Sequence, residues 1–233
     1  MEIYSLDLLT CSQIYDLYSK KRIGVSKLSI ADRKERERLQ RQNLIIDAAE
    51  KVFISKGFEH ATMDDIAEEA EFSKGTLYTY FQSKNELCLS IVLRGLKVLI
   101  CEFEKVVNES TLSINKIELI AKKFLSFYNK YPNFIFAFSN YKQHRAGCKF
   151  ESSVLEDIDA ENKCIRKMIS KIIQEGQQDN SIRTDADPKK ISYILWGELS
   201  GLIPNLLQDL GNIDSFELYN YTMQLIREAI KKN

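Results

Sequence analysis

The chain has 233 residues, of which 44% are hydrophobic, and it contains nine glycines and three prolines. Lys and Arg together number 33, as do Asp and Glu, so the formal net charge is zero. This length suits one large domain or a small domain joined to a medium one, and so few glycines and prolines exclude a low-complexity chain. A neutral chain is not a general polycation, so a nucleic-acid partner has to be met by a local basic patch.

The cysteines and the apolar runs argue against a zinc-binding protein, a secreted protein and a membrane protein. Five cysteines form no C-x-x-C pair and are accompanied by two histidines, which makes a poor zinc set. We expect them to be small buried residues in a reducing cytoplasm, with no metal site and no cofactor. Glu2, Asp7 and Asp16 interrupt the N-terminal apolar residues, which argues against a secretory signal. No uncharged apolar run reaches the roughly 18 residues of a membrane span.

Residues 1–30 form an N-terminal extension with three open interpretations. Apolar residues from Ile3 to Leu17 fit one helical face, and the basic sequence SKKR follows them. The segment from Lys20 to Arg38 carries eight basic and three acidic residues. A loosely attached tail, a short helix docked on the body and a basic arm that enters a DNA groove all remain possible interpretations.

Helical periodicity dominates the rest of the chain. Apolar residues repeat at three and four positions in 32–56, with Gly57 as a C-terminal stop. Thr62 is the expected N-cap of a short helix that ends near Ala70, and Ser73 that of a second short helix at 74–80. Ser83 then begins a long helix that ends near Asn108. Five further helices are predicted, at about 113–130, 132–145, 151–178, 188–210 and 215–231, with a kink or break near Gly201 caused by Pro204. The fold class is therefore all-α.

The short helix at 74–80 has an unusual composition, SKGTLYTYF. Leu77 and Phe81 are four residues apart and face the interior, which leaves Lys74, Thr76 and Thr79 outside. Two short helices joined by three residues form a helix-turn-helix, and a helix start with small polar side chains and free amides suits a polyanion. Gly75 allows close approach of another molecule, and Lys84 is placed to hold a phosphate.

The stretch ATMDDIAEEAEFSKGTLYTYFQSKNEL, preceded by IIDAAEKVFISKGFEH, resembles the DNA-binding domain of the TetR (tetracycline-repressor-type) family of bacterial transcription regulators. The resemblance covers about residues 40–90 without gaps. It implies that Lys74, Gly75, Thr76 and Thr79 face the major groove, and that Thr62, Tyr78, Tyr80 and Lys84 hold the phosphate backbone beside the Ser73 cap. The family usually has glycine in the turn where this chain has Glu71, which is strained if its φ is positive.

Aromatic residues crowd the sequence FLSFYNKYPNFIFAFSNY. Phe134, Phe138, Tyr141 and Arg145 share one helical face. Ordinary core packing and a pocket for an apolar effector both remain open. In the second case the expected wall residues are Phe127, Phe134, Phe138, Tyr141 and Trp196, with Arg145 as an anchor.

The last two helices carry more apolar surface than one inward face needs. Gly197 and Gly201 are four residues apart, which allows two helices to approach closely. The resemblance implies a four-helix dimer interface here, with internal packing as the alternative. The expected interface residues are Gly197, Gly201, Leu202, Tyr219, Leu225 and Ile226.

Together these features predict an N-terminal extension (1–30), a helix-turn-helix domain (31–86) and a helical effector-binding and dimerisation domain (87–233). The predicted function is a cytoplasmic, ligand-responsive repressor that binds a palindromic DNA operator as a homodimer. A small helical enzyme is disfavoured because no catalytic residues, phosphate loop or metal cluster are recognisable. A protein-interaction module is disfavoured by the phosphate-suited helix start.

Overall fold

The computed structural model describes residues 30–145, 153–206 and 214–232. In that part of the chain the structure is helical, apart from an isolated β-bridge between Ile182 and Lys231. The helices are α2 (Ile30–Lys56), α3 (Met63–Glu69), α4 (Lys74–Tyr80), α5 (Lys84–Val107), α6 (Ser113–Lys130), α7 (Pro132–Arg145), α8 (Ser153–Gln178), α9 (Pro188–Leu206) and α10 (Ser215–Ile230).

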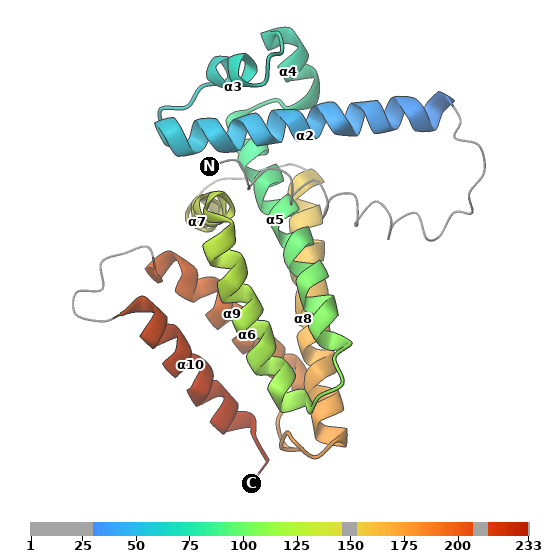
Figure 1. The fold of residues 1–233 in the computed structure, drawn as a ribbon, viewed down its shortest axis with the longest axis vertical. Coiled ribbons are helices and arrows are strands. Elements are labelled where there is room, and N and C mark those ends of the chain that lie inside the picture. The colour runs from blue at the N-terminus through green and yellow to red at the C-terminus, as the bar shows by residue number, and fades with distance from the viewer. Residues whose placement is uncertain (1–29, 146–152, 207–213, 233) are drawn as a thin grey trace.

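The first three of these helices form a small unit at one end of the molecule (Figure 1). The long helix α2 lies across the top of the body, and the short helices α3 and α4 sit above it. Ile45, Ala49, Ile66 and Leu77 are completely or almost completely buried and belong to the core. The unit is small, so its stability depends on this apolar contact and on the helix caps described below.

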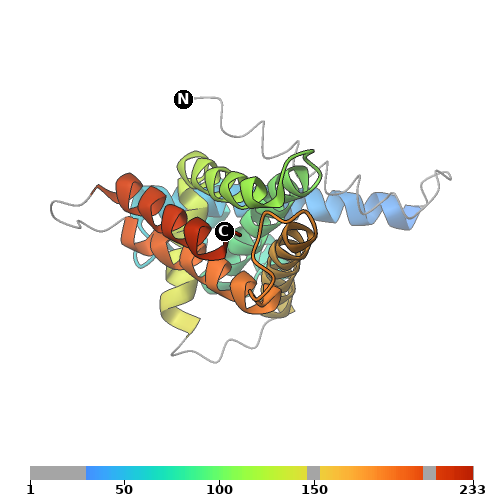
Figure 2. The same cartoon turned by 90° about the horizontal axis from the view of Figure 1, so that it is seen from below.

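The remaining helices form an elongated body in which α5 and α8 lie side by side (Figure 1). Helices α6, α7 and α9 complete its core, where isoleucine and phenylalanine predominate. Figure 2 shows α10 on the outside of the body, beside α6 and α9. Among the described residues, we find no helix with the length and apolar character that crossing a bilayer requires.

The helix α5 connects the small unit to the body. It starts at Lys84 next to α4, with Ser83 accepting a hydrogen bond from the Glu86 amide, and continues without interruption to Val107. The domain boundary predicted at residue 86 therefore falls within the first turn of α5. Because α5 enters the body and also contacts α2, it links the small unit to the body.

The helices predicted from periodicity occur at the expected places within the described residues. The sequence predicts a kink or break near Gly201. The helix is not broken there, since α9 continues from Pro188 to Leu206. The N-terminal extension 1–29, and the ends of two predicted helices at 151–152 and 207–210, lie outside the described residues.

Candidate functional site

The start of α3 is held by a reciprocal cap between Thr62 and Asp65. The Thr62 hydroxyl accepts from the Asp65 amide at 3.1 Å and donates to Asp65 Oδ2 at 2.8 Å, while the Thr62 amide donates to the same carboxylate at 2.9 Å. Lys56 approaches Asp65 at 2.6 Å. The hydrogen bond from Lys56, followed by those from Thr62, lowers the pKa of Asp65 to about 2. The hydroxyl of Thr62, predicted to contact a phosphate, is thus already engaged in the cap.

The turn between α3 and α4 meets the condition under which the sequence predicts strain at Glu71. Glu71 adopts a φ of 57°, in the left-handed region where a side chain is disfavoured. Amides of the turn are nevertheless bonded, because Glu71 N donates to Glu68 O and Phe72 N donates to Ala67 O, both at 3.0 Å. The Glu71 side chain is exposed, so its charge faces solvent beside α4.

The helix α4 buries one face and exposes its N-terminal turn, as predicted. Leu77 and Phe81 are 0% and 1% exposed. On the outer side, the Ser73 hydroxyl accepts from the Thr76 amide at 3.1 Å and lies 2.8 Å from Thr76 Oγ1. A Cβ atom at Gly75 would meet nothing closer than Ser73 Oγ at 4.0 Å. The space above Gly75 is therefore open to another molecule.

The other residues of α4 that are predicted to contact DNA differ in how exposed their side chains are. Thr79 is exposed, although its hydroxyl donates to the Thr76 carbonyl at 2.6 Å. Tyr78 is 37% exposed and Tyr80 is half-buried. Lys74 is exposed but forms an ion pair with Asp64 of α3 at 2.7 Å, so its charge is partly compensated in the free protein. The hydrogen bond to Asp64 raises the pKa of Lys74, and the ammonium group remains charged.

Lys84 has a structural role that the sequence analysis missed. Its Nζ donates to the carbonyl oxygens of Phe58, Glu59 and Ala61, at 2.8, 3.0 and 3.3 Å, and lies 4.8 Å from the centre of the Phe58 ring. All three ammonium hydrogens thus have acceptors. In the free protein Lys84 therefore holds the loop between α2 and α3 against the start of α5, and its predicted contact with a phosphate stays a prediction.

The N-terminal half of α2 provides a further basic surface. Figure 1 shows this half extending beyond the rest of the small unit, and every side chain from Arg33 to Arg41 is exposed. Arg33 and Arg38 pair with glutamates on the same helix. Lys34, Arg36 and Arg41 have no ion-pair partner among the described residues. The hydrogen bond with Glu35 raises the pKa of Arg38.

A charged cluster fixes α2 to the body. Arg94 of α5 lies 2.5 Å from Asp47 and 2.6 Å from Glu50, both on α2. Asn133, at the start of α7, also donates to Glu50 at 3.2 Å. Burial alone lowers the pKa of Arg94, but the charges of Glu50 and Asp47 outweigh it and raise this pKa. The position of the small unit thus depends on α5 and α7 together.

The aromatic residues predicted as effector walls form a closely packed cluster. Phe127, Phe134, Phe138 and Tyr141 are buried, with consecutive ring centres 5.1, 5.3 and 6.0 Å apart. Trp196 packs edge-on against Phe124 at 5.8 Å and donates its indole N–H to Asn162. These contacts favour the core interpretation of the aromatic stretch. The side chain of Arg145 lies outside those that the structure describes.

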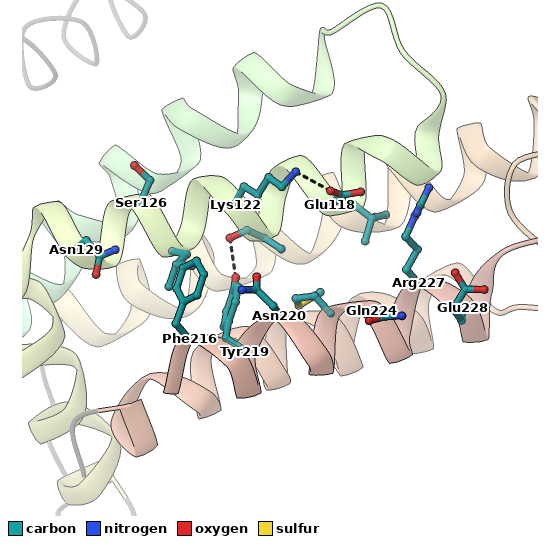
Figure 3. A pocket seen from close by; sticks show the side chains of 14 residues that line it. Glu118, Lys122, Ser126, Asn129, Phe216, Tyr219, Asn220, Gln224, Arg227 and Glu228 are labelled. Atoms are coloured by element: carbon teal, nitrogen blue, oxygen red, sulfur yellow. Dashed lines mark hydrogen bonds and ion pairs between the residues drawn. The ribbon is translucent and has the colours of Figure 1, made fainter. Parts of the chain in front are cut away.

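A cavity of the body lies instead between α6 and α10, as Figure 3 shows. Its volume is about 690 Å³, within the range of small-molecule sites. None of the predicted wall residues lines it. The sequence signal for this cavity is weak, because its lining mixes apolar, polar and charged residues from two amphipathic helices that are far apart in the sequence.

The last two helices expose an apolar surface, which we call the α9–α10 face. Gly197 and Gly201 are exposed, and a Cβ atom on either would meet nothing within 4 Å. Leu225 is 54% exposed, whereas Leu202 and Ile226 are half-buried. The large apolar residues on the face are Tyr193, Ile194, Tyr221 and Leu225, whereas the exposed Phe216 of α10 lines the cavity beside α6.

One predicted interface residue is not on that face. Tyr219 is 2% exposed, and its hydroxyl donates to the Ala121 carbonyl of α6 at 2.6 Å. Burial raises the pKa of Tyr219. Tyr219 therefore packs inside the protomer, toward α6, and its predicted part in a dimer interface stays a prediction.

Comparison with known proteins agrees with the geometry of the small unit. Residues 45–91 match the family described as "Bacterial regulatory proteins, tetR family". An HTH-type transcriptional regulator of Bacillus subtilis, YfiR, is 47% identical over 57 residues, which are 24% of this chain and 28% of that protein. The fatty acid metabolism regulator protein of the same organism is 21% identical over 80% of this chain and 93% of its own length.

The whole described architecture also has a counterpart among solved structures. The crystal structure of the transcriptional regulator FadR from Bacillus subtilis, in complex with stearoyl-CoA, aligns with a TM-score of 0.64 and 21% identity. The alignment covers 80% of this chain and 98% of the FadR chain, which extends the likeness of the fold to the helical body. The helix-turn-helix of residues 45–91 thus matches the tetR family of bacterial regulatory proteins, and the described architecture shares its fold with FadR.

Proposed function

We propose that the protein is a ligand-responsive transcription regulator that binds an operator through the exposed N-terminal turn of α4. The observation that carries this proposal is the open space at Gly75, on a short helix whose opposite face is buried through Leu77 and the adjoining Phe81. A helix N-terminus provides free amides and a favourable dipole for phosphate, while small side chains leave room for base edges.

The proposed contacts on DNA differ in kind. Thr76 and Thr79 face base edges, and Lys74 exchanges Asp64 for DNA when the complex forms. The exposed bases Lys34, Arg36 and Arg41 of α2 contribute salt-dependent attraction to the phosphate backbone. Lys84 supports binding indirectly, by holding the loop and the start of α5 in place.

We propose that specific DNA binding requires a second protomer. One short helix reads only a few base pairs, so specific binding calls for two half-sites, which a two-fold dimer provides about one or more helical turns apart. The α9–α10 face supports this arrangement, because its aromatic and aliphatic residues are exposed beside two glycines that admit a close helix contact. We therefore assign this face to the isologous interface.

The effector is proposed to be a mostly apolar small molecule. The support is the apolar body and the names of similar proteins, since one relative is a fatty acid metabolism regulator and a structural neighbour was solved with stearoyl-CoA. As a repressor, the protein leaves its operator when the effector prefers the arrangement of the dimer that does not bind DNA. A 100-fold preference corresponds to about 2.7 kcal/mol, within the usual range of coupling free energies.

The experiment that tests the proposal combines DNA binding with assembly. Genomic fragments retained by the purified protein are sequenced, and the recovered duplex is titrated with wild type and with Thr76→Ala at several salt concentrations. We expect Thr76→Ala to lose roughly 1–3 kcal/mol on the recovered duplex and nothing on a scrambled one. Equal binding of both duplexes by wild type contradicts operator recognition.

Assembly is measured separately by sedimentation. Gly201→Leu places a side chain in open space within the protomer, so the variant folds, but it separates two helices that meet at the α9–α10 face. We expect a dimeric wild type and a monomeric variant at micromolar concentration. A monomeric wild type contradicts the proposed interface.

A further inference from the structure

The groove between α6 and α10 is built from an apolar floor and a charged end (Figure 3). Lining residues on α6 extend from Ile117 to Asn129, a length of about 18 Å at ~1.5 Å per residue. The groove is therefore elongated. Its apolar lining residues are Ile117, Ala121, Leu125, Phe216, Tyr219 and Met223.

One end of the groove holds charges that largely compensate each other. Lys122 and Glu118 of α6 are 2.6 Å apart. The hydrogen bond from Lys122 lowers the pKa of Glu118, with a smaller contribution from the charge of Arg227 on α10. Glu228 also lines this end. Two acids and two bases leave this end close to neutral, so it does not attract an anion by net charge alone.

Arg227 nevertheless has an unused donor at this end. Its Nη2 donates to Asn115 Oδ1 at 3.3 Å, but its buried Nε has no acceptor among the described residues. A buried N–H without an acceptor is costly, and such groups in native proteins usually mark a function or a missing partner. An oxygen atom of a bound molecule is a suitable acceptor for a guanidinium group.

The groove is on a different side of α10 from the proposed dimer contact. Asn220 and Gln224 line the groove, whereas Tyr221 and Leu225 are exposed on the α9–α10 face. Asn220 and Leu225 are five positions apart, which is about 140° around a helix. A partner protomer on Tyr221 and Leu225 thus leaves the groove side of α10 uncovered.

We propose that this groove binds an elongated amphiphile, with its apolar tail along the floor and an oxygen-bearing head group toward Arg227, and that it is the effector site of the regulator. The binding part stands on the groove itself, and only the effector role rests on the proposed function.

The position of the groove explains how its occupant affects DNA binding. Helix α10 forms one wall of the groove and part of the α9–α10 face, so a molecule that separates α10 from α6 also changes the orientation of the two protomers. Rotation of protomers about an interface is a common route of regulation. It changes the spacing of the two α4 helices, which must match the half-site spacing of DNA.

Binding is tested with 8-anilinonaphthalene-1-sulfonate, a fluorescent probe with an apolar ring system and an oxygen-bearing head. Asn220→Trp fills the groove from an exposed position, and Lys167→Trp, on the exposed side of α8, is the matched control. We expect Asn220→Trp to weaken probe binding at least tenfold and Lys167→Trp to leave it unchanged. Equal titration of all three folded proteins, checked by circular dichroism, overturns the proposal.

The head-group assignment is tested by displacement of the probe. Dodecanoate and dodecanol have the same tail length, but only dodecanoate carries an anionic oxygen head. We expect dodecanoate to displace the probe at least tenfold more effectively, and this difference to disappear in Arg227→Met, which keeps the apolar stem. No difference between the two in wild type, or a difference that persists in Arg227→Met, contradicts the role of Arg227.

The effector role is tested on DNA with the same variants. We expect dodecanoate to weaken operator binding by wild type and to have no effect on Asn220→Trp. A wild type that binds the probe in the groove but binds no specific DNA leaves the ligand site intact and contradicts the proposed function. A wild type that binds DNA equally with and without the bound amphiphile contradicts the effector role.

Discussion

Phe134 of α7 packs so closely against Gly95 of α5 that a Cβ atom at position 95 would lie 1.9 Å from Phe134 Cδ2. The residues next to them, Asn133 and Arg94, both contact Glu50 of α2. This close contact of α5 and α7 thus lies beside the charged cluster of Arg94, Asp47 and Glu50. Packing in the aromatic cluster and the position of α2 are therefore coupled.

Gly95→Ala is expected to destabilise the protein, because the buried Phe134 ring has to move and has little space to do so. Overpacking of this kind typically costs about 1–3 kcal/mol. Urea unfolding followed by circular dichroism measures the loss. Gly75→Ala is the matched control, since its added methyl group meets nothing closer than 4.0 Å and is expected to leave stability equal or slightly higher. Equal stability of wild type and Gly95→Ala contradicts the tight contact.

Lys84→Met is expected to lower the free energy of unfolding and to leave the salt dependence of DNA binding unchanged. The variant keeps an apolar stem over Phe58 but leaves three carbonyl oxygens without their shared donor. We expect a loss of about 1–3 kcal/mol in the free energy of unfolding, and an unchanged slope of log affinity against log salt. A slope reduced by about one phosphate contact, with unchanged stability, indicates instead that Lys84 binds DNA directly.

Glu71→Gly is expected to increase both the stability of the protein and its affinity for DNA. Glycine removes the penalty of a φ of 57° but increases the entropy of the unfolded chain, so the net gain is at most about 1 kcal/mol. Glu71→Gln separates the two effects, because it removes the charge and keeps the backbone strain. We expect both variants to bind DNA more tightly, and only the glycine variant to gain stability in thermal unfolding.

Stability is expected to decrease in acid through two carboxylates at helix starts. The hydrogen bonds described above hold the pKa of Asp65 at about 2, below its ordinary 3.8. Burial raises the pKa of Asp179, but hydrogen bonds from Ser181 and Ser113 outweigh it and lower this pKa to about 2 as well. Because the unfolded state binds protons more readily, this stability is complete above about pH 4 and is lost as pH falls toward about 2.

The measurement is the urea midpoint as a function of pH. Asp65→Asn and Asp179→Asn are each expected to be less stable than wild type near pH 6, and to approach wild type as pH falls through this window. A constant difference between each variant and wild type across the window contradicts the depressed pKa values.

The sequence predicts the helices well because their signals are local. Capping residues such as Ser73 and Ser83, and apolar spacing such as Leu77 with Phe81, act within one or two turns. Glu71 stands where the resemblance has glycine, which predicts strain if its φ is positive, and the observed φ of 57° meets that condition. Local patterns of this kind are sufficient to locate the helix-turn-helix.

Such local patterns do not predict contacts between segments that are far apart in the sequence. Lys84 meets carbonyls 23 to 26 residues earlier, in a loop whose path begins with Gly57 at a φ of 77°. Tyr219 was assigned to the outer face, although its hydroxyl bonds to Ala121, 98 residues away. The groove between α6 and α10 likewise arises from the separation of two helices, which periodicity within each helix does not reveal.

The central claim, that the N-terminal turn of α4 reads DNA, is tested most directly with Gly75→Leu on a duplex selected by the wild-type protein. A leucine at this position points into open space in the free protein, so folding is unaffected. In the complex the same side chain occupies the space that the DNA backbone or base edges need. We expect unchanged thermal unfolding, and a preference for the selected over a scrambled duplex that falls from about 10³-fold or more to near unity. A Gly75→Leu variant that retains the wild-type preference would contradict the account.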